Sequence, residues 1–423
     1  MDGTEAGRRR PWYRKLHWQI LIAMAAGVAV GAVGGEGAAE RFGWLGTLFI
    51  RALKMVIVPL VLTSIISGVA SVGGGRTFGR LFGKTLGYYV ATSLLAILLG
   101  LALTNLIRPG AGLDLSRARQ EALPEDLETP QSVVDLLLDL VPENVVVAAS
   151  KPDMLALIFF SILFGIALGS LAEERRAPVV RFFEGAFETM MKLTGLVLAV
   201  APLGVFGLMT RAVATFGLDA FRAMALYMVT IAIGLTLHLG VTLPAMLRIF
   251  GGIRPSIHFR NVAEPLAVAF STSSSAATLP VTLSAVERRV GVSNRVTSFV
   301  LPMGATVNMD GTALYECAGV LFIAQALGFE LSIAQQAVVV LTALLASIGA
   351  AAVPSAGLVI IFIVLEAVGL RGPQVEALVG FMLAVDRPLD MYRTAVNVAS
   401  DTCGAAIIAR SEGESEVDAA VIA

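Results

Sequence analysis

The stretches STSSSAATLP (residues 271–280) and SIGAAAVPSAG (residues 347–357) decide the fold of this chain. Each one interrupts a long apolar run, at 261–286 and at 332–366, with small and polar residues about halfway along. A helix that crosses a bilayer needs about 20 consecutive apolar residues, so a run broken at its middle does not cross as one regular helix. We predict that each run enters the membrane and returns as a helical hairpin.

The rest of the chain is apolar enough for a protein that crosses the membrane many times. Of its 423 residues, 56% are hydrophobic and 15% are charged, whereas about 25% are charged in a typical soluble domain. Its basic residues fall beside apolar runs, so the net charge of -1 does not indicate nucleic-acid binding. Full-length spans are predicted at 17–35, 44–72, 85–107, 153–171, 189–213, 222–247, 296–325 and 375–400.

The basic loops predict the direction of both hairpins. Cytoplasmic loops are enriched in Lys and Arg, and the N-terminal segment 1–16 is basic. The basic loop ERRVGVSNR (287–295) stays on that same side only if the run before it enters and returns. Few charges flank the second hairpin, which predicts entry from outside. We therefore expect an all-α polytopic protein of the cell (inner) membrane, with eight transmembrane helices, two re-entrant hairpins of opposite polarity and both termini in the cytoplasm.

A polar stripe marks the last apolar run, VDRPLDMYRTAVNVASDTCG (385–404). Burying a charge at the bilayer centre costs on the order of 2.5–3.5 kcal/mol, so the stripe must contact protein or water. Arg387 is expected to point elsewhere on the helix, and without it the stripe carries a net charge of -2. A structural ion-pair ladder is possible, but the negative excess favours bound cations. At about 100° per residue, one face carries Asp386, Asp390, Arg393, Asn397 and Asp401.

A second motif, PMGATVNMDGTALYE (302–316), lies inside the seventh predicted span. Glycine and asparagine are poor residues for a helix interior, so local unwinding is expected here. Freed backbone carbonyls together with Asn308 and Asp310 oxygens suit a monovalent cation. An ordinary kink would explain the glycines but not a buried Asp310. Glu316 has no partner nearby in the sequence, and because burial favours the neutral form of a carboxyl group, it is a candidate proton carrier.

The two hairpin tips complete the predicted site. The serines at 271–275 offer hydroxyls and free backbone amides at a helix N-terminus, which favour an anionic group. A serine run usually marks a solvated loop, but this one lies at the centre of an apolar run. The second tip has small residues and Pro354, as a hinged gate requires. Paired broken helices of this kind point to the substrate site of a transporter.

Together these motifs resemble the glutamate/aspartate transporter family, the dicarboxylate and amino acid:cation symporters. The resemblance covers residues 40–405 and is carried by NMDGT (308–312), by the pattern D..RT..NV..D at 390–401 and by GYYVATS (87–93). It implies an inverted-repeat fold, a homotrimer in membrane lipid and an elevator mechanism. Scaffold helices would lie at 17–72 and 132–213. A moving transport domain would comprise 85–107 and 222–405, with hairpin 1 at 257–287, hairpin 2 at 332–366 and a cytoplasmic tail at 406–423, disordered over SEGESEVDAAVIA (411–423).

The resemblance also implies the residues of the site. Arg393 would bind the side-chain carboxylate of an acidic amino acid and Asp390 its ammonium group, with Asp386 supporting them. Further substrate contacts would come from Ser273, Ser274, Ser275, Thr312, Val353, Gly357, Thr394 and Asn397. One sodium would bind Gly304, Asn308, Asn397 and Asp401; a second Thr306, Met309, Ser347, Ile348 and Ala350; and a third Tyr89, Thr92, Ser93, Asn308 and Asp310.

Three positions decide which member of the family this chain is like. Ser273 and Met391 stand where archaeal and animal members, respectively, carry an arginine. Glu316 matches the proton-carrying glutamate of animal members. The expected function is therefore import of glutamate or aspartate with sodium and a proton, with potassium counter-transport left open.

Other functions are less well supported by the residues. A C4-dicarboxylate has no ammonium group for Asp390, and a neutral amino acid would leave a buried Arg393 unpaired, which is costly. A channel would need a continuous polar pore. An intramembrane enzyme is not expected, because the chain has no G-x-S-x-G motif and its histidines, His17, His238 and His258, are scattered.

Overall fold

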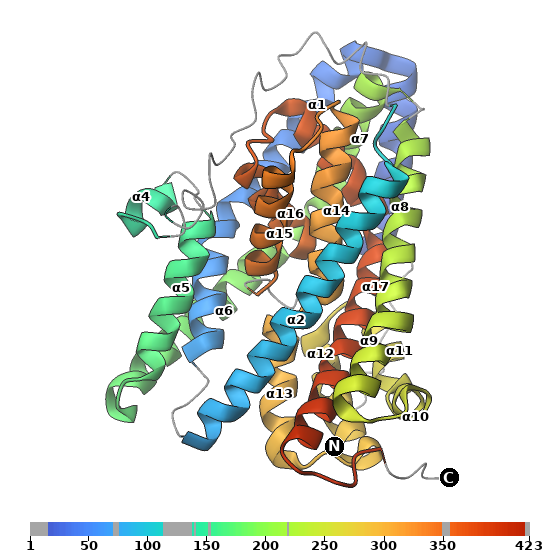
Figure 1. Ribbon diagram of the computed structural model, residues 1–423. Coiled ribbons are helices and arrows are strands. Elements are labelled where there is room, and N and C mark those ends of the chain that lie inside the picture. Colours follow the sequence, from blue (N-terminus) through green and yellow to red (C-terminus); the bar gives the residue numbers. More distant parts are fainter. Residues whose placement is uncertain are drawn as a thin grey trace, which may run out of the picture.

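The chain folds into helices in the computed structural model, which describes residues 16–70, 76–112, 138, 141–150, 154–217, 220–348 and 356–418 (Figure 1). Every regular element within these residues is helical. The first half contains α1 (Leu16–Ala70), α2 (Arg76–Ile107), α4 (Val145–Ser150), α5 (Met154–Gly169), α6 (Glu173–Ala199), α7 (Ala201–Phe216) and α8 (Ala220–Leu237). The second half contains α9 (Leu243–Met246), α10 (Pro255–Asn261), α11 (Ala263–Thr272), α12 (Ser275–Ala285), α13 (Asn294–Val307), α14 (Asp310–Ala326), α15 (Ile333–Ile348), α16 (Ala356–Ala367) and α17 (Pro373–Ser411). Three π-helical turns lie at His238–Thr242, Leu247–Gly251 and Val286–Val290.

The first two predicted spans are joined without a loop. α1 runs through both of them, and Gly35 is the residue with non-helical angles inside it (φ 52°, ψ -140°). A positive φ is cheap for glycine alone, so one residue is enough to break the helix there. Residues 36–43, which lie between the two predicted spans, are also helical.

The fifth predicted span, 189–213, is wrong as a single helix. It is divided between α6 and α7, which meet at Val200 and are bent by 53°. Pro202 lies in the first turn of α7, where a proline is tolerated and a new helix commonly starts. With that pair counted as one span, the described residues contain four segments long and apolar enough to cross a membrane; the others are Trp18–Ala70, Arg80–Ile107 and Phe221–Gly251.

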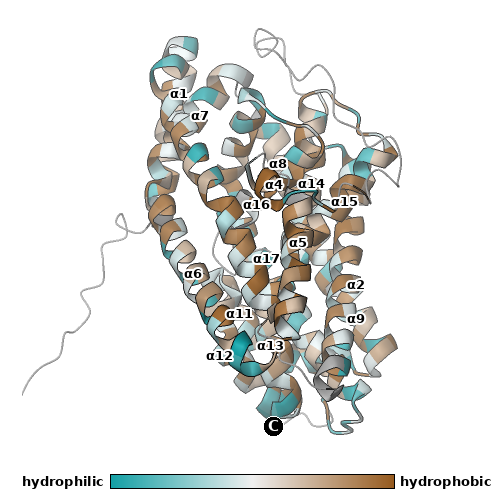
Figure 2. Cartoon of the chain, turned by 90° about the vertical axis from the view of Figure 1, so that its left-hand side faces the viewer, coloured by the Kyte–Doolittle hydropathy of each residue, from teal (hydrophilic) through white to brown (hydrophobic). Residues whose placement is uncertain are grey.

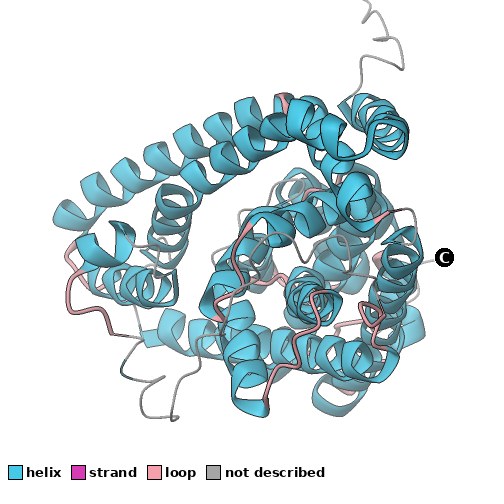
Figure 3. Cartoon of the chain, turned by 90° about the horizontal axis from the view of Figure 1, so that it is seen from above, coloured by secondary structure: helices cyan, strands magenta, loops and turns pink. Residues whose placement is uncertain are grey.

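The helices pack in two groups. α1, α5, α6 and α7 contact one another and form an arc, whereas α2, α8 and α11–α17 form a bundle beside it (Figure 3). The arc meets the bundle where α7 packs on α17 and α5 on α15. Figure 2 shows hydrophobic residues along the middle of the helices and hydrophilic residues mostly near their ends. α14 is the innermost helix, with every residue except Gln325 buried.

Three breaks interrupt the bundle. α11 ends at Ser273, which has left-handed angles (φ 53°), and the Ser274 hydroxyl then caps α12 by accepting from the Ala277 amide. α13 and α14 are separated by the extended Asn308 and by Met309. α15 and α16 pack on each other, and the tip between them, 349–355, lies outside the described residues.

The expected disorder of 411–423 is wrong for residues 411–418, which we call the C-terminal clasp. These residues turn back from α17 onto the rest of the bundle, and Val417 is buried in a core cluster with Val286 and Val290. The Asp418 amide donates to the Val290 carbonyl at 2.7 Å. Composition predicted disorder because the segment is acidic, but its acids meet basic and amide groups from other helices.

Candidate substrate and cation site

Arg393 is the centre of the polar stripe on α17. Its side chain is 1% exposed, and Nη2 lies 3.0 Å from both Asp386 Oδ1 and Asp390 Oδ1. The three residues share a face because they are three and seven positions apart. The guanidinium group also lies 3.8 Å from the centroid of the Tyr315 ring, a cation–π contact from α14. The sequence does not predict this role of Tyr315, although it points to its neighbour Glu316.

Arg387 does not point away from the stripe as expected. Its Nη1 lies 3.6 Å from Asp390 Oδ2, and its side chain is 38% exposed. Residues three apart on a helix are neighbours, and the arginine side chain is long enough to reach across the intervening angle. The Asp390 carboxylate therefore lies between two guanidinium groups. The charges of two aspartates and two arginines cancel at Asp386, Arg387, Asp390 and Arg393. The remaining negative charge of the stripe is that of Asp401.

Two donors of Arg393 remain available. Among the described residues, Nε and Nη1 have no hydrogen-bond partner although both are buried. Buried polar groups are nearly always paired, so such donors indicate a ligand or a neighbouring segment that completes the set. A Cβ on Gly357 would lie 3.3 Å from Nη1, which shows how closely the start of α16 covers the guanidinium group. Val353, predicted in the same wall, lies outside the described residues.

Asn397 joins the stripe to the first turn of α14. Its Oδ1 accepts from the Gly311 amide at 2.8 Å, and its Nδ2 donates to the Thr312 hydroxyl at 3.3 Å. Thr394 behaves differently, because its hydroxyl donates to the Asp390 carbonyl of its own helix. Asn397 thus lies with the predicted substrate residues.

The tip between α11 and α12 contributes a further unpaired hydroxyl. Ser273 is 2% exposed, and its Oγ has no partner among the described residues. Ser275 is also buried, and both α11 and α12 pack against α17. The serine run is therefore part of the packed bundle rather than a solvated loop.

The first predicted cation group converges around Asp401. Asn308 Nδ2 donates to Asp401 Oδ1 at 2.9 Å and to the Ser400 hydroxyl at 3.0 Å, while Asn308 Oδ1 is buried without a partner in the described chain. A Cβ on Gly304 would collide with Asp401 Oδ1 and lie 2.5 Å from the Tyr89 hydroxyl. No Lys, Arg or His of the described residues lies within ion-pair distance of Asp401. Oxygen atoms of this kind are what a hard cation prefers.

The third predicted group contains a partner that the sequence analysis missed. Asp310 accepts from the Ser93 hydroxyl at 2.7 Å, and its other oxygen lies 3.0 Å from His238 Nε2. All three side chains are buried. The Tyr89 and Thr92 hydroxyls instead donate to backbone carbonyls. Because His238 is separated from Asp310 by 72 residues, no local spacing could reveal the pair; the available signal was a polar residue within an apolar span.

The second predicted group is only partly described. The hydroxyls of Thr306 and Ser347 donate to carbonyls of their own helices, and Met309 is buried. Ile348 packs against a core cluster that includes residues of α13. Ala350 lies outside the described residues.

Glu316 lies in α14 beside this site and is fully buried. Neither of its carboxylate oxygens has a hydrogen-bond partner among the described residues. Burying an ionised carboxylate without a partner is very costly. Its environment therefore favours the neutral, protonated form of the carboxyl group.

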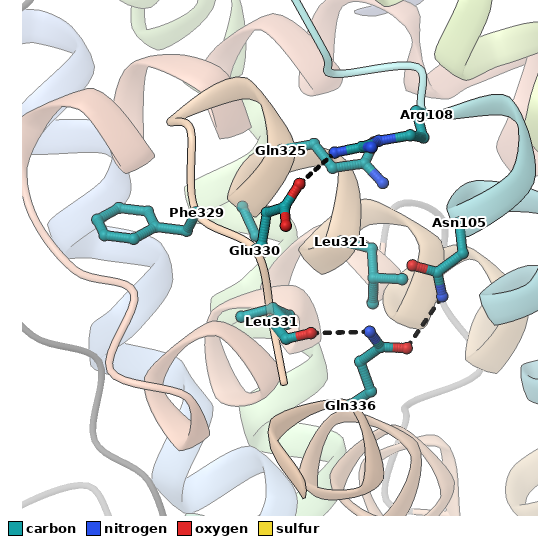
Figure 4. A pocket seen from close by; sticks show the side chains of 9 residues that line it. Asn105, Arg108, Leu321, Gln325, Phe329, Glu330, Leu331 and Gln336 are labelled. Carbon is teal, nitrogen blue, oxygen red and sulfur yellow. Dashed lines mark hydrogen bonds and ion pairs between the residues drawn. The ribbon is translucent and has the colours of Figure 1, made fainter. Parts of the chain in front are cut away.

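A cavity of about 210 Å³ lies at another place, at the ends of α2 and α14 and the start of α15 (Figure 4). The ion pair of Arg108 with Glu330 (2.6 Å) and the hydrogen bond from Asn105 to Gln336 (2.9 Å) lie along it. Arg108 and Glu330 are exposed and already paired, so this cavity lacks the unpartnered groups found around Arg393.

The sequence matches known transporters over nearly its whole length. The sodium:dicarboxylate symporter family matches residues 16–411. The chain is 36% identical to a proton/glutamate-aspartate symporter of Escherichia coli (strain K12), over 94% of this chain and 93% of that protein. It is 34% identical to a proton/sodium-glutamate symport protein of Bacillus caldotenax, over 94% and 95%. It is 33% identical to a C4-dicarboxylate transport protein of Agrobacterium fabrum, over 96% and 90%.

Proposed function

Because this chain belongs to the sodium:dicarboxylate symporter family, we propose that it imports an acidic amino acid, glutamate or aspartate, together with sodium ions and a proton. The observation that carries the proposal is Arg393, a buried guanidinium group next to the Asp390 carboxylate with two donors that have no partner among the described residues. A site that holds one cation and one anion 3.0 Å apart suits a ligand that carries both charges. The names of the relatives support the same substrate class.

In this proposal the side-chain carboxylate of the substrate accepts a charge-assisted hydrogen bond from Nη1 of Arg393. Its ammonium group pairs with Asp390. Its main-chain carboxylate binds near Asn397, Thr312 and the α11–α12 tip at Ser273–Ser275, where an unpaired hydroxyl and helix N-terminal amides favour an anion. Gly357 at the start of α16 lies over the guanidinium group, and Asp386 holds Arg393 in place.

Sodium is part of the transported cargo. Asp401, Asn308 and the Gly304 backbone supply oxygens for one ion, and the unpartnered Asn308 Oδ1 supports this assignment. Asp310 and Ser93 would hold a second ion, with Asn308 shared. A further ion would use the α13–α15 contact around Thr306, Met309 and Ser347. Potassium counter-transport is left open.

The moving unit is the bundle, and the arc is the scaffold of a homotrimer. This division is supported by the packing, because α1, α5, α6 and α7 contact one another more than they contact the bundle. Where the two groups meet, Phe49, Leu208, Phe362 and Gly380 line an apolar interface. A rigid bundle moving along it would carry the site from one side of the membrane to the other, as in other transporters built from repeats.

Uptake by the purified protein in lipid vesicles tests this function. With an inward sodium gradient we expect concentrative uptake of radiolabelled aspartate or glutamate, and Arg393→Ala should lower it at least about 100-fold, since a buried charge pair loses a partner. Arg393→Lys, which keeps the charge but not the planar fork, should also fail. Arg222→Ala removes an exposed arginine and serves as the control. Retained uptake in folded Arg393→Ala would contradict the substrate assignment.

Proton coupling is tested at Glu316. Glu316→Gln keeps the size of the side chain but cannot exchange a proton, so its uptake should no longer depend on an imposed pH gradient while it still depends on sodium. Uptake is measured in vesicles at a fixed outer pH with the inner pH varied. A Gln variant that responds to the pH gradient like the wild type would exclude this role.

A further inference from the structure

Arg387 gives Asp390 a second cationic partner that the proposed transport mechanism does not use. Asp390 Oδ1 faces Arg393, whereas Oδ2 faces Arg387 at 3.6 Å. Asp390 is nearly buried, and Arg387 is 38% exposed. The two pairs therefore differ: one is internal to the site, and the other reaches in from its rim.

The rim position makes the Arg387 pair exchangeable. A partly exposed ion pair holds its two side chains together only weakly, so Arg387 can be exchanged for another cation at Asp390. The Arg387 side chain can therefore leave Asp390 when another cation takes its place. An incoming ammonium group competes with Arg387 for the same carboxylate oxygen.

A ligand without an ammonium group has a different effect. A four-carbon dicarboxylate such as succinate can place one carboxylate on Arg393 and the other near Asn397. Without Arg387, the Asp390 carboxylate would repel this ligand. Arg393 would then be the only cation facing both the Asp390 carboxylate and the ligand carboxylate. With Arg387 in place, the charges of residues 386–393 already cancel, so the dicarboxylate meets no net repulsion.

We propose that Arg387 determines substrate specificity by pairing with Asp390 whenever the substrate lacks an ammonium group, so that one site accepts both an acidic amino acid and a C4 dicarboxylate. This inference rests on the proposed function, because it uses the same site. It reverses the expectation from the sequence that Asp390 excludes dicarboxylates. It also makes opposite predictions for the two ligand classes, which a purely structural role of Arg387 does not.

The test compares binding of aspartate and succinate to the purified protein in detergent with sodium present. In the wild type, succinate displaces radiolabelled aspartate. In Arg387→Ala the ratio of the succinate Kd to the aspartate Kd should rise about tenfold, since succinate weakens and aspartate binds equally well or better. Arg387→Lys retains the charge and should restore most of the wild-type ratio. Arg371→Ala, an exposed arginine before α17, should leave the ratio unchanged.

Each outcome decides the question. The inference is overturned if the wild type binds aspartate but a 1,000-fold excess of succinate, about three decades of affinity, does not displace the aspartate. An Arg387→Ala ratio within about twofold of the wild type also overturns it. If Arg387→Ala does not fold, Arg387→Gln is measured in its place with the same criterion. Absence of aspartate binding in the wild type would instead overturn the proposed function itself, so the two failures are distinguishable.

Discussion

Buried charged groups differ between the middle of α17 and the segment that follows it: among the described residues, the first lack some partners and the second have them. In residues 386–401, Arg393 keeps two donors without partners in the described chain, and Asp401 has no cationic partner there. In the C-terminal clasp (411–418) the acids that pack against other helices have partners. Asp418 accepts from His258 Nδ1 and Asn261 Nδ2, each at 2.8 Å. Glu412 pairs with three basic side chains: Arg80 at 2.7 Å, Lys84 at 2.6 Å and Arg295 at 3.8 Å.

This difference separates a functional site from a structural one. Buried polar groups normally find partners, so a fully paired cluster needs nothing more and its role is to hold helices together. A buried cluster with missing partners is stable when something else supplies them. The substrate and cation site that we propose therefore lies in the middle of α17, and the paired acids lie just after the end of that helix.

Gly304→Ala should have the largest effect, a loss of sodium affinity at the site that we propose in the middle of α17. Its methyl group would collide with Asp401 and the Tyr89 hydroxyl, so we expect sodium affinity to fall about 100-fold while the protein remains folded. The measurement is the sodium dependence of aspartate binding. Gly87→Ala is the matched control, because a Cβ there meets nothing within 4 Å. Equal sodium dependence in both variants would remove Asp401 from the cation site.

Asp418→Ala should destabilise the C-terminal clasp and leave the proposed substrate site in the middle of α17 intact. Two buried donors, on His258 and Asn261, lose their acceptor, which costs about 2–3 kcal/mol of stability. We expect a lower thermal midpoint in detergent with unchanged aspartate Kd. Glu416→Ala, an exposed acid in the same segment, should change neither. A large change in Kd without a change in thermal midpoint would show that the clasp belongs to the functional site.

Glu412→Gln should have the smallest effect, a loss of stability that depends on pH. Hydrogen bonds from Arg80 and Lys84 lower the pKa of Glu412 from 4.5 to about 2. Because the folded pKa is depressed, its stabilisation is present above pH 4.5 and is lost as the pH falls toward 2. The free energy of unfolding of the wild type should exceed that of Glu412→Gln by about 1 kcal/mol at pH 7, and this difference should narrow below pH 4.5. A gap that is constant with pH would assign the effect to packing instead.

The sequence by itself determined the class of protein and two of the places where its helices break. Apolar content predicts a membrane protein, and the poor helix formers around Asn308 and Ser273 predict breaks that the structure contains. The stripe of Asp386, Asp390 and Arg393 follows from the helical period, which is a local property of one segment. Motifs of this kind also predicted the family.

Only the tertiary structure decided which side chains from different helices meet. Tyr315 covers Arg393, and His238 meets Asp310, because α14 lies between α8 and α17 in the bundle. The helical angle placed Arg387 off the stripe, but its flexible side chain reaches Asp390. The acidic tail has the composition of a disordered segment, yet it is fixed by donors more than 100 residues away in sequence. Helical period is set by backbone geometry within a few residues, whereas contacts such as Tyr315 with Arg393 and His238 with Asp310 depend on how whole helices pack.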